Sequence, residues 1–307
     1  MPDPTTPAPR PLTVWATSQD HPRVQRRDRY TPASTAHPAK MLPALAAHLI
    51  ATFTQPGDLI LDPMCGIGTT LVEATHLGRH GIGIEYEPRW ASTARTNVAL
   101  ARSQGATGQA AVLTGDARDL ADSARPIPDI AGFPAAGNVA LILTSPPYGK
   151  ATHGQVDADR ENGVHKRNYQ YGTPRRGNLA DADLPGLLDG FQAILTATTT
   201  LLRHGGLIAV TVRPYRHDGA LVDLPGAITT RAPASGLERA DRAAALLAGL
   251  RGSGLVPRTT FFALHNARTA WAHGTPLHVI AHEDVLLLQR PTTATTDTPP
   301  GGNPDPV

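Results

Sequence analysis

One stretch of this sequence, LDPMCGIGTTLVEA, places Gly66 and Gly68 between a short apolar run and the start of a helical pattern. Glycines at such a turn allow the backbone to approach a ligand closely at the helix N-terminus. Glu85 follows Asp62 by 23 positions, a distance at which an acidic residue accepts hydrogen bonds from ribose hydroxyls. Asp116 ends the next apolar run. These residues indicate a nucleoside-type cofactor, and their spacing does not choose between NAD and another nucleoside.

A second stretch, TSPPYG, runs from Thr144 to Gly149 directly after the apolar run NVALIL. Neither proline has an N–H to donate, so the ladder of a sheet stops at this point. The stretch therefore predicts a stiff polar turn at the end of a buried strand. Taken alone, it is equally typical of a proline-stiffened turn with a packing tyrosine.

The composition excludes several other classes. The glycine loop lacks the Lys-Ser/Thr ending of a phosphate-binding P-loop, which argues against an NTPase. The single cysteine permits no internal disulfide, and the cytoplasm is the expected compartment. The N-terminus has no apolar signal segment, and no apolar run approaches the roughly 18 residues that a membrane span needs. A formal charge of +2 does not by itself indicate nucleic acid.

The elements that must position these residues alternate between helix and strand. The order of the first six is a helix at 41–53, a strand ending at Asp62, a helix after the glycine loop, a strand ending near Glu85, a helix ended by Gly105 and a strand before Asp116. Such steps are typical of βαβ units, in which helices cover both faces of a parallel sheet. The carboxyl ends of the strands then meet at one edge, where ligands bind.

The second half of the chain continues the pattern. It predicts strands at 139–144 and 205–212, helices at 184–203 and 237–251, and then two strands, RTTFFALH and EDVLLLQR, as an antiparallel pair at a sheet edge. Residues 1–34 are interpreted as a basic, partly disordered tail, 35–290 as the ordered domain, and 291–307 as a disordered tail.

Several of these stretches together resemble a known superfamily. DPMCGIGTTLVEA, GIGIEYEP, GDA and TSPPYG, in this order, are similar to the S-adenosylmethionine-dependent amino-methyltransferases. This group includes DNA cytosine-N4 and adenine-N6 methyltransferases and the related tRNA guanine-N2 methyltransferases of the Trm family. STAHPAKMLPALAAHLI and AHEDVLLLQR also resemble segments of the DNA enzymes. The resemblance implies a Rossmann-like fold with a seven-stranded, mostly parallel sheet whose last strand is antiparallel.

The resemblance also implies the cofactor, S-adenosyl-L-methionine, and the residues that hold it. The loop from Asp62 to Gly68 would cradle its methionine part, Glu85 its ribose and Asp116 its adenine amine, while His37 to Lys40 would cap the methionine end. The full predicted set is His37, Lys40, Asp62, Pro63, Cys65, Gly66, Gly68, Thr69, Glu85 and Asp116.

The chemistry of an exocyclic base amine explains the proline turn. The lone pair of such an amine is delocalised into the ring, which makes the nitrogen a poor nucleophile. Two acceptors aimed at its N–H groups favour a pyramidal nitrogen, and the Ser145 hydroxyl and the Pro146 carbonyl are suited to this. Pro147 stiffens the turn, and Tyr148 offers a ring to stack on a base taken out of its helix. These four are the predicted catalytic residues.

Cys65 is a candidate nucleophile by type but not by place. Base C5-methyltransferases carry a cysteine at the turn that Ser-Pro-Pro-Tyr occupies in this chain, whereas Cys65 lies in the glycine loop. We therefore expect a packing role and no covalent catalysis. The 13 histidines show no metal-ligand spacing, and no metal is expected.

The segment after the turn is long and polar. Between Lys150 and Asn178 it holds six Lys/Arg and three acidic residues. Basic residues suit phosphates and tyrosines suit bases, so this loop at 149–182 is the predicted nucleic-acid contact, with 21–30 as a weaker candidate. The residues named for this contact are Lys150, Lys166, Arg167, Tyr169, Tyr171, Arg175 and Arg176.

Three functional hypotheses follow. A DNA amino-methyltransferase is favoured, with the leading serine resembling the cytosine-N4 branch more than the adenine-N6 branch. An RNA guanine-N2 methyltransferase would use the same core chemistry and fits the small room left for target recognition. A cofactor-binding regulatory protein without catalysis is the alternative of another class. The target sequence, a restriction partner and the oligomeric state stay open.

Overall fold

The computed structural model describes most of the chain. The described residues are 12–121, 127, 129–130, 132, 134–149, 155–159, 163–167, 177–217, 220–258 and 261–291. For the two short strands within 155–167, only the backbone is described. The predicted tail at 291–307 lies outside this set from residue 292 onward.

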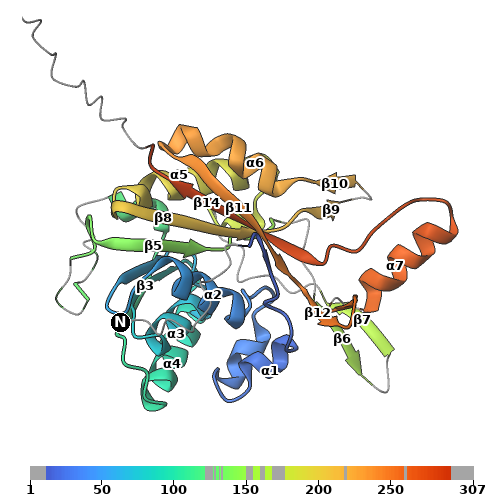
Figure 1. The fold of residues 1–307 in the computed structure, drawn as a ribbon, viewed down its shortest axis with the longest axis horizontal. Coiled ribbons are helices and arrows are strands. Elements are labelled where there is room, and N and C mark those ends of the chain that lie inside the picture. Colours follow the sequence, from blue (N-terminus) through green and yellow to red (C-terminus); the bar gives the residue numbers. More distant parts are fainter. Residues whose placement is uncertain are drawn as a thin grey trace, which may run out of the picture.

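The centre of the molecule is one sheet of eight strands (Figure 1). In spatial order these are β1 (Val14–Trp15), β11 (Glu238–Leu246), β14 (His282–Gln289), β8 (Leu202–Val212), β5 (Val139–Thr144), β2 (Leu59–Asp62), β3 (His80–Glu85) and β4 (Ala110–Thr114). β14 runs antiparallel to both of its neighbours, and the other pairs of this sheet are parallel. The predicted fold class is confirmed, but the predicted number of seven strands is wrong because β1 adds an eighth at the edge.

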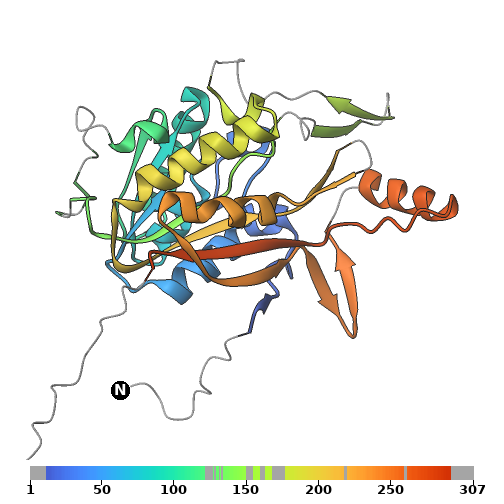
Figure 2. The same ribbon diagram turned by 90° about the horizontal axis from the view of Figure 1, so that it is seen from above.

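Helices cover both faces of the sheet (Figures 1 and 2). One face carries α2 (Pro43–Phe53), α3 (Thr69–His76) and α4 (Pro88–Ser103), and the other carries α5 (Leu184–Thr199) and α6 (Leu224–Arg231). In β5, Leu141 packs in the cluster with Leu45 of α2, whereas Ile142 packs in the cluster with Phe191 of α5. A strand buried on both faces reads as a continuous apolar run, which is what NVALIL is. Among the described residues, no helix is long and apolar enough to cross a membrane.

Two predicted elements are wrong. The predicted helix at 237–251 is the strand β11 followed by β12 (Ala248–Arg251). Ala243 and Ala245 are both buried on one face of the strand, and pairing with β14 decides the conformation. The predicted strand RTTFFALH instead leads into α7 (Phe261–Ala272). The antiparallel partners of β14 are β11 and β8, so β14 lies inside the sheet and not at its edge as predicted.

Several small elements extend beyond the carboxyl ends of the parallel strands (Figures 1 and 2). They are the hairpins β6–β7 (Gln155–Asp159 and Gly163–Arg167), β9–β10 (Tyr215–His217 and Ala220–Val222) and β12–β13 (Ala248–Arg251 and Gly254–Pro257), together with α7. Short 3-10 turns complete the fold: η1 (Pro32–Ala36), η2 (Ala117–Ala121), η4 (Leu179–Asp181) and η5 (Ala232–Ser235). This side of the sheet therefore carries more structure than the sequence predicted.

The N-terminal segment is folded from residue 12 onward, in contrast to the predicted tail at 1–34. It forms β1, α1 (Pro22–Arg26) and η1. Arg29 and Tyr30 both bind the buried carboxylate of Glu73 in α3, at 2.6 Å from the Arg29 Nη2 and from the Tyr30 hydroxyl. The sequence could not reveal these long-range partners, because a polar, proline-containing segment becomes ordered only through contacts with the domain.

A second buried contact ties this segment to the glycine loop. Asn97 in α4 is fully buried, and its Oδ1 accepts from the Thr31 backbone N–H at 2.9 Å and from the Thr31 hydroxyl at 2.8 Å. Its Nδ2 donates to Ser34 Oγ at 2.9 Å and to the Ile67 carbonyl at 2.8 Å. One side chain therefore connects α4, the N-terminal segment and the loop.

We expect Asn97→Ala to lower the free energy of unfolding by about 2–4 kcal/mol, because several buried donors and acceptors lose their partner. The measurement is urea unfolding followed by circular dichroism. The matched control is Thr96→Ala, one position away and exposed, which should stay within about 0.5 kcal/mol of the wild type. Equal stability of the two variants would contradict the bridging role of Asn97.

Candidate cofactor and active site

A pocket of about 1210 Å³ opens at the carboxyl ends of β2, β3, β4 and β5. This is larger than the roughly 300–1,000 Å³ typical of a site for one small molecule. Of the predicted cofactor and catalytic residues, all but Gly68 line it: His37, Lys40, Asp62, Pro63, Cys65, Gly66, Thr69, Glu85, Asp116, Ser145, Pro146, Pro147 and Tyr148. The two stretches singled out in the sequence thus face one cavity.

Asp62 ends β2 and begins the glycine loop. Its Oδ1 accepts from the Met64 N–H at 3.1 Å, and its Oδ2 accepts from the Thr70 hydroxyl at 2.6 Å. Burial raises the pKa of Asp62 to about 6, although these hydrogen bonds oppose the shift. The carboxylate joins the end of the strand to the first turn of α3 and fixes the span of the loop between them.

Glu85 ends β3, the neighbouring strand. Its Oε2 accepts from the Gly66 N–H at 2.8 Å, and its Oε1 accepts from the Glu87 N–H at 2.9 Å. Burial raises the pKa of Glu85 to about 7 in spite of both amides. Each carboxylate oxygen keeps a lone pair for a further donor.

Steric constraints explain why glycine occupies positions 66 and 68 of the loop. Gly66 has a φ of +52°, and a Cβ there would lie 3.1 Å from Nε2 of His37. Gly68, at the N-cap of α3, has a φ of +81°, and its Cβ would lie 3.1 Å from the Cβ of Ala94. Both positions combine the left-handed backbone that glycine tolerates with a close neighbour.

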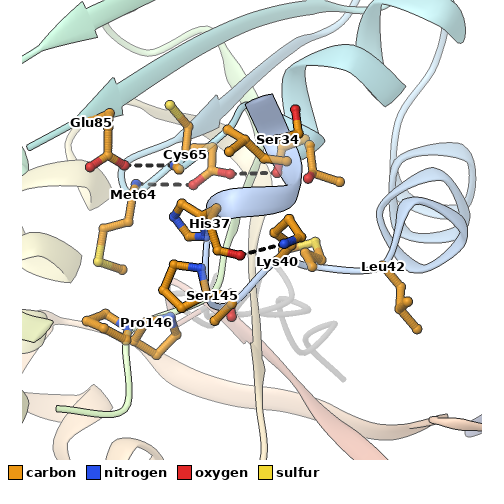
Figure 3. A pocket seen from close by; sticks show the side chains of 18 of the residues that line it. Ser34, His37, Lys40, Leu42, Met64, Cys65, Glu85, Ser145 and Pro146 are labelled. Atoms are coloured by element: carbon orange, nitrogen blue, oxygen red, sulfur yellow. Dashed lines mark hydrogen bonds between the residues drawn. The ribbon is translucent and has the colours of Figure 1, made fainter. Parts of the chain in front are cut away.

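His37 closes the loop from the other side. It lies between the loop that carries Cys65 and the turn that carries Ser145 (Figure 3), and its ring meets Trp90 edge-on at 4.6 Å. Burial lowers the pKa of His37 to about 3, with a smaller contribution from Lys40, so the ring is neutral. Lys40 donates to the His37 carbonyl at 2.5 Å, and burial lowers its pKa to about 8.

Cys65 packs inside the loop as expected. A Cβ on Gly83 of β3 would lie 2.8 Å from its Sγ, so the thiol fills the space beside that strand. Burial raises the pKa of the thiol, and the nearby carboxyl groups of Glu85 and Asp62 add to the shift. A thiol held neutral in this way is a poor nucleophile.

Asp116 follows β4 and faces the pocket, but it already has a strong partner. Arg118 donates to it through its backbone N–H at 2.9 Å and its Nε at 2.9 Å, and its Nη2 reaches the Gly177 carbonyl at 2.8 Å. Burial raises the pKa of Asp116, and the Arg118 hydrogen bonds outweigh that effect and lower it. The contact to an adenine amine therefore stays a prediction, with Arg118 as a competing donor.

The Ser-Pro-Pro-Tyr turn directly follows β5. Ser145 is half-buried and Pro146 is buried. Gly149 closes the turn with a φ of +66°, and a Cβ there would lie 2.7 Å from the Ala182 carbonyl oxygen. Tyr148 is 9% exposed, and its ring lies against Tyr215 at 6.0 Å, edge to face.

The predicted nucleic-acid contacts fall largely outside the described residues. Lys150, Tyr169, Tyr171, Arg175 and Arg176 are not among them. Lys166 and Arg167 lie on β7, for which only the backbone is described. Their contact with nucleic acid stays a prediction.

The first part of the chain matches a family model. The model is described as DNA methylase and matches residues 6–96. A type II methyltransferase from Bacillus subtilis, M.BglI, is 44% identical over 62 residues, which are 20% of this chain and 18% of the relative. M2.DpnII from Streptococcus pneumoniae is 44% identical over 59 residues, 19% of this chain and 22% of the relative. The matched segments thus span about a fifth of each relative.

The resemblance to the S-adenosylmethionine-dependent amino-methyltransferases is confirmed. The cofactor of this family is S-adenosylmethionine. Among solved structures, TrmN from Thermus thermophilus is 17% identical with a TM-score of 0.49, over 87% of this chain and 53% of that one.

The residues of this site fit that cofactor. Gly66 leaves the space that a Cβ would fill, directly between the loop and His37. Glu85 and Asp62 are buried carboxyl groups at neighbouring strand ends, and carboxylate oxygens suit the hydroxyl and ammonium donors of an amino-acid nucleoside. The pocket volume leaves room for a second molecule beside the cofactor.

Sequence reasoning missed several residues of the pocket. Arg26 and Tyr30 lie in the stretch 21–30, which was named only as a weaker nucleic-acid candidate, and Ser34 lies in the segment interpreted as a tail. No local pattern signals that these residues reach this pocket. Tyr86 and Arg118 could have been found, because each directly follows or nearly follows a predicted acidic strand end. The further pocket residues without a predicted cofactor or catalytic role include Arg26, Tyr30, Ser34, Tyr86, Arg118, Arg213 and Glu283.

We expect Glu85→Gln to weaken S-adenosylmethionine binding by about 10- to 100-fold, since hydrogen bonds to a charged acceptor are lost. The wild-type affinity should rise as the pH passes about 7, where Glu85 becomes ionised, while the variant should show a flatter profile. Calorimetry across this pH range measures both, with Glu238→Gln on the exposed start of β11 as the control. Parallel pH profiles of the wild type and Glu85→Gln would refute the assignment.

The raised pKa of Glu85 makes the free energy of unfolding fall with rising pH, whereas cofactor affinity is expected to rise. Because the folded pKa of about 7 lies above the reference value of 4.5, the contribution of Glu85 is present below pH 4.5 and is lost as the pH rises through 7. Unfolding of the ligand-free protein should show this loss in the wild type and lack it in Glu85→Gln.

Proposed function

We propose that this protein transfers a methyl group from S-adenosylmethionine to an exocyclic amine of a base in DNA, with cytosine N4 favoured and adenine N6 as the other amine. The observation that carries the proposal is the common cavity. The Ser-Pro-Pro-Tyr turn and the carboxylate-held glycine loop line the same pocket. The DNA methylase model and the two type II methyltransferases support DNA as the polymer.

The turn supplies two acceptors for the amine. When bound, the cofactor supplies an electrophilic methyl group on a sulfonium. The Ser145 hydroxyl and the Pro146 carbonyl accept the two amine N–H groups and direct the nitrogen lone pair toward that methyl. Gly149 and the prolines hold the turn in place before substrate arrives, so little reorganisation is needed in the reaction.

The site needs no strong base and no covalent intermediate. The amine nitrogen becomes acidic as its new N–C bond forms, so a hydroxyl, a carbonyl and water suffice to take its proton away. The raised pKa of the Cys65 thiol fits this, since a neutral thiol in the loop takes no part. His37, neutral and packed on Trp90, acts as a wall of the site.

A second feature supports a nucleic-acid substrate. The segment 247–281, which carries β12, β13 and α7, contains three arginines and no Asp or Glu. It extends from the sheet on the side where the strands open to the pocket, and Arg258 at its base lines that pocket (Figure 2). Arg251 and Arg268 are exposed on it. An acid-free surface of this kind suits a phosphate backbone.

We expect Ser145→Ala to lose about 100-fold or more in kcat while S-adenosylmethionine affinity stays within about twofold, since Ser145 contacts the amine and not the cofactor. The assay is mass spectrometry of nucleosides from DNA and RNA of cells that express the wild type or Ser145→Ala. Ser92→Ala, on the surface of α4, is the control. N4-methylcytosine is the expected product. N6-methyladenine selects the other DNA branch, N2-methylguanosine in RNA contradicts a DNA substrate, and no product in either polymer contradicts catalysis.

We expect Arg251→Ala combined with Arg268→Ala to weaken DNA binding uniformly across sequences. If each arginine neutralises one phosphate, the slope of log K against log salt should fall by about 1.8. Fluorescence anisotropy at several salt concentrations measures this slope. Arg102→Ala, exposed on α4, is the control. An unchanged slope in the double variant would show that the segment 247–281 does not contact DNA phosphates.

A further inference from the structure

Glu283 is a pocket residue to which none of the preceding chemistry gives a role. It is the second residue of β14 and lines the same pocket as Ser145. Its Oε2 atom is buried and has no hydrogen-bond partner among the described residues, although the residue as a whole is only half-buried. Burial raises the pKa of Glu283, and the positive charge of Arg213 partly offsets this.

The neighbouring residue Asp284 is a carboxylate with a structural role. Asp284, on the opposite face of the strand, accepts from Arg242 Nε through its Oδ1 at 2.9 Å, although its Oδ2 is also buried without a hydrogen bond. Glu283 has no such anchoring partner among the described residues, and an unpartnered buried carboxyl oxygen costs free energy. Glu283 is therefore placed to receive a polar group that enters with a ligand.

The register of the strands locates Glu283 relative to the catalytic turn. β8 lies between β5 and β14, with Thr144 beside Val210 and Asp284 beside Val212. Ser145 directly follows β5 and Glu283 lies near the start of β14, so the two residues belong to strands that are two spacings, or about 10 Å, apart at the same edge of the sheet. A planar base that is hydrogen-bonded on two sides fits a gap of this order.

Arg213 directly follows β8, the strand between them. Its guanidinium carbon lies 5.6 Å from the centre of the Tyr148 ring, and Tyr215 packs on the same ring. The cation–π contact holds Tyr148 and sets the positive charge beside Glu283. Tyr148, Arg213 and Glu283 are therefore one connected group on the lining of the pocket.

We propose that the Glu283 carboxyl binds the ring nitrogen next to the target amine and so selects the base, an inference that rests on the proposed function. Cytosine N3 and adenine N1 are acceptors, and a protonated carboxyl donates to either. The guanine amine lies between N1, which carries a hydrogen and cannot accept, and N3, which can, so the contact disfavours a guanine that presents its N1 side to Glu283. Burial of Glu283 favours the protonated form that the contact requires.

The test compares Glu283→Ala with Glu283→Gln. Alanine removes the donor, and kcat/KM for the target base should fall about 10- to 100-fold with relaxed preference among cytosine, adenine and guanine oligonucleotides. Glutamine keeps an N–H donor and should retain at least about a third of the wild-type value. Cofactor affinity should be unchanged in both variants, as in the control Glu238→Ala at the exposed start of β11.

Two results would overturn the assignment. Wild-type kcat/KM and base preference in Glu283→Ala show that the residue does not contact the base, and loss of cofactor affinity shows that it binds the cofactor instead. If the wild type methylates no base, the proposed function fails separately. Binding of cytidine 5′-monophosphate to the cofactor-loaded wild type and Glu283→Ala, measured by NMR, then decides the role of Glu283. Weaker binding in the variant supports it, and equal binding overturns it.

Discussion

The hydrogen bond from the Gly66 amide to the Glu85 carboxylate joins a loop after one strand to the end of the next. Asp62 performs the corresponding task within its own loop, through Met64 and Thr70. Both carboxyl groups are buried, and that burial raises their pKa values. The glycine loop is thus held by two carboxyl groups, those of Asp62 and Glu85, whose ionised forms are unfavourable because they are buried. A ligand that donates hydrogen bonds to these carboxylates offsets part of the free-energy cost of burying them.

The N-terminal segment depends on the same loop. Asn97 connects Thr31 and Ser34 to the Ile67 carbonyl, and His37 packs where Gly66 has no side chain. The segment therefore orders against a surface that exists only after the loop has formed. The pocket is closed on this side by residues that contribute nothing to the sheet core.

The sequence could bring forward candidate cofactor residues because their signals are local. Gly66 and Gly68 mark a turn by their own backbone needs, and Asp62 and Glu85 stand directly at the ends of apolar runs. The failures are contacts decided over long distances. The residues of β11 were predicted as a helix, and only their pairing with β14 makes them a strand. Glu283 lay within a recognised stretch, but no pattern there shows that its Oε2 is buried without a hydrogen-bond partner.

The proposed cofactor residues and the proposed substrate residues of the pocket lie on different strands, so each set can change without the other. The loops after β2, β3 and β4 surround the cofactor residues, whereas Ser145, Arg213 and Glu283 belong to the ends of β5, β8 and β14. Since β14 is antiparallel, Glu283 enters the site from the start of its strand, and the acid-free segment before it leads directly there. Under the proposed function, a change in that segment would alter base or polymer selection without moving a residue of the glycine loop. The structure thus separates the residues proposed to select the substrate from those proposed to hold the methyl donor.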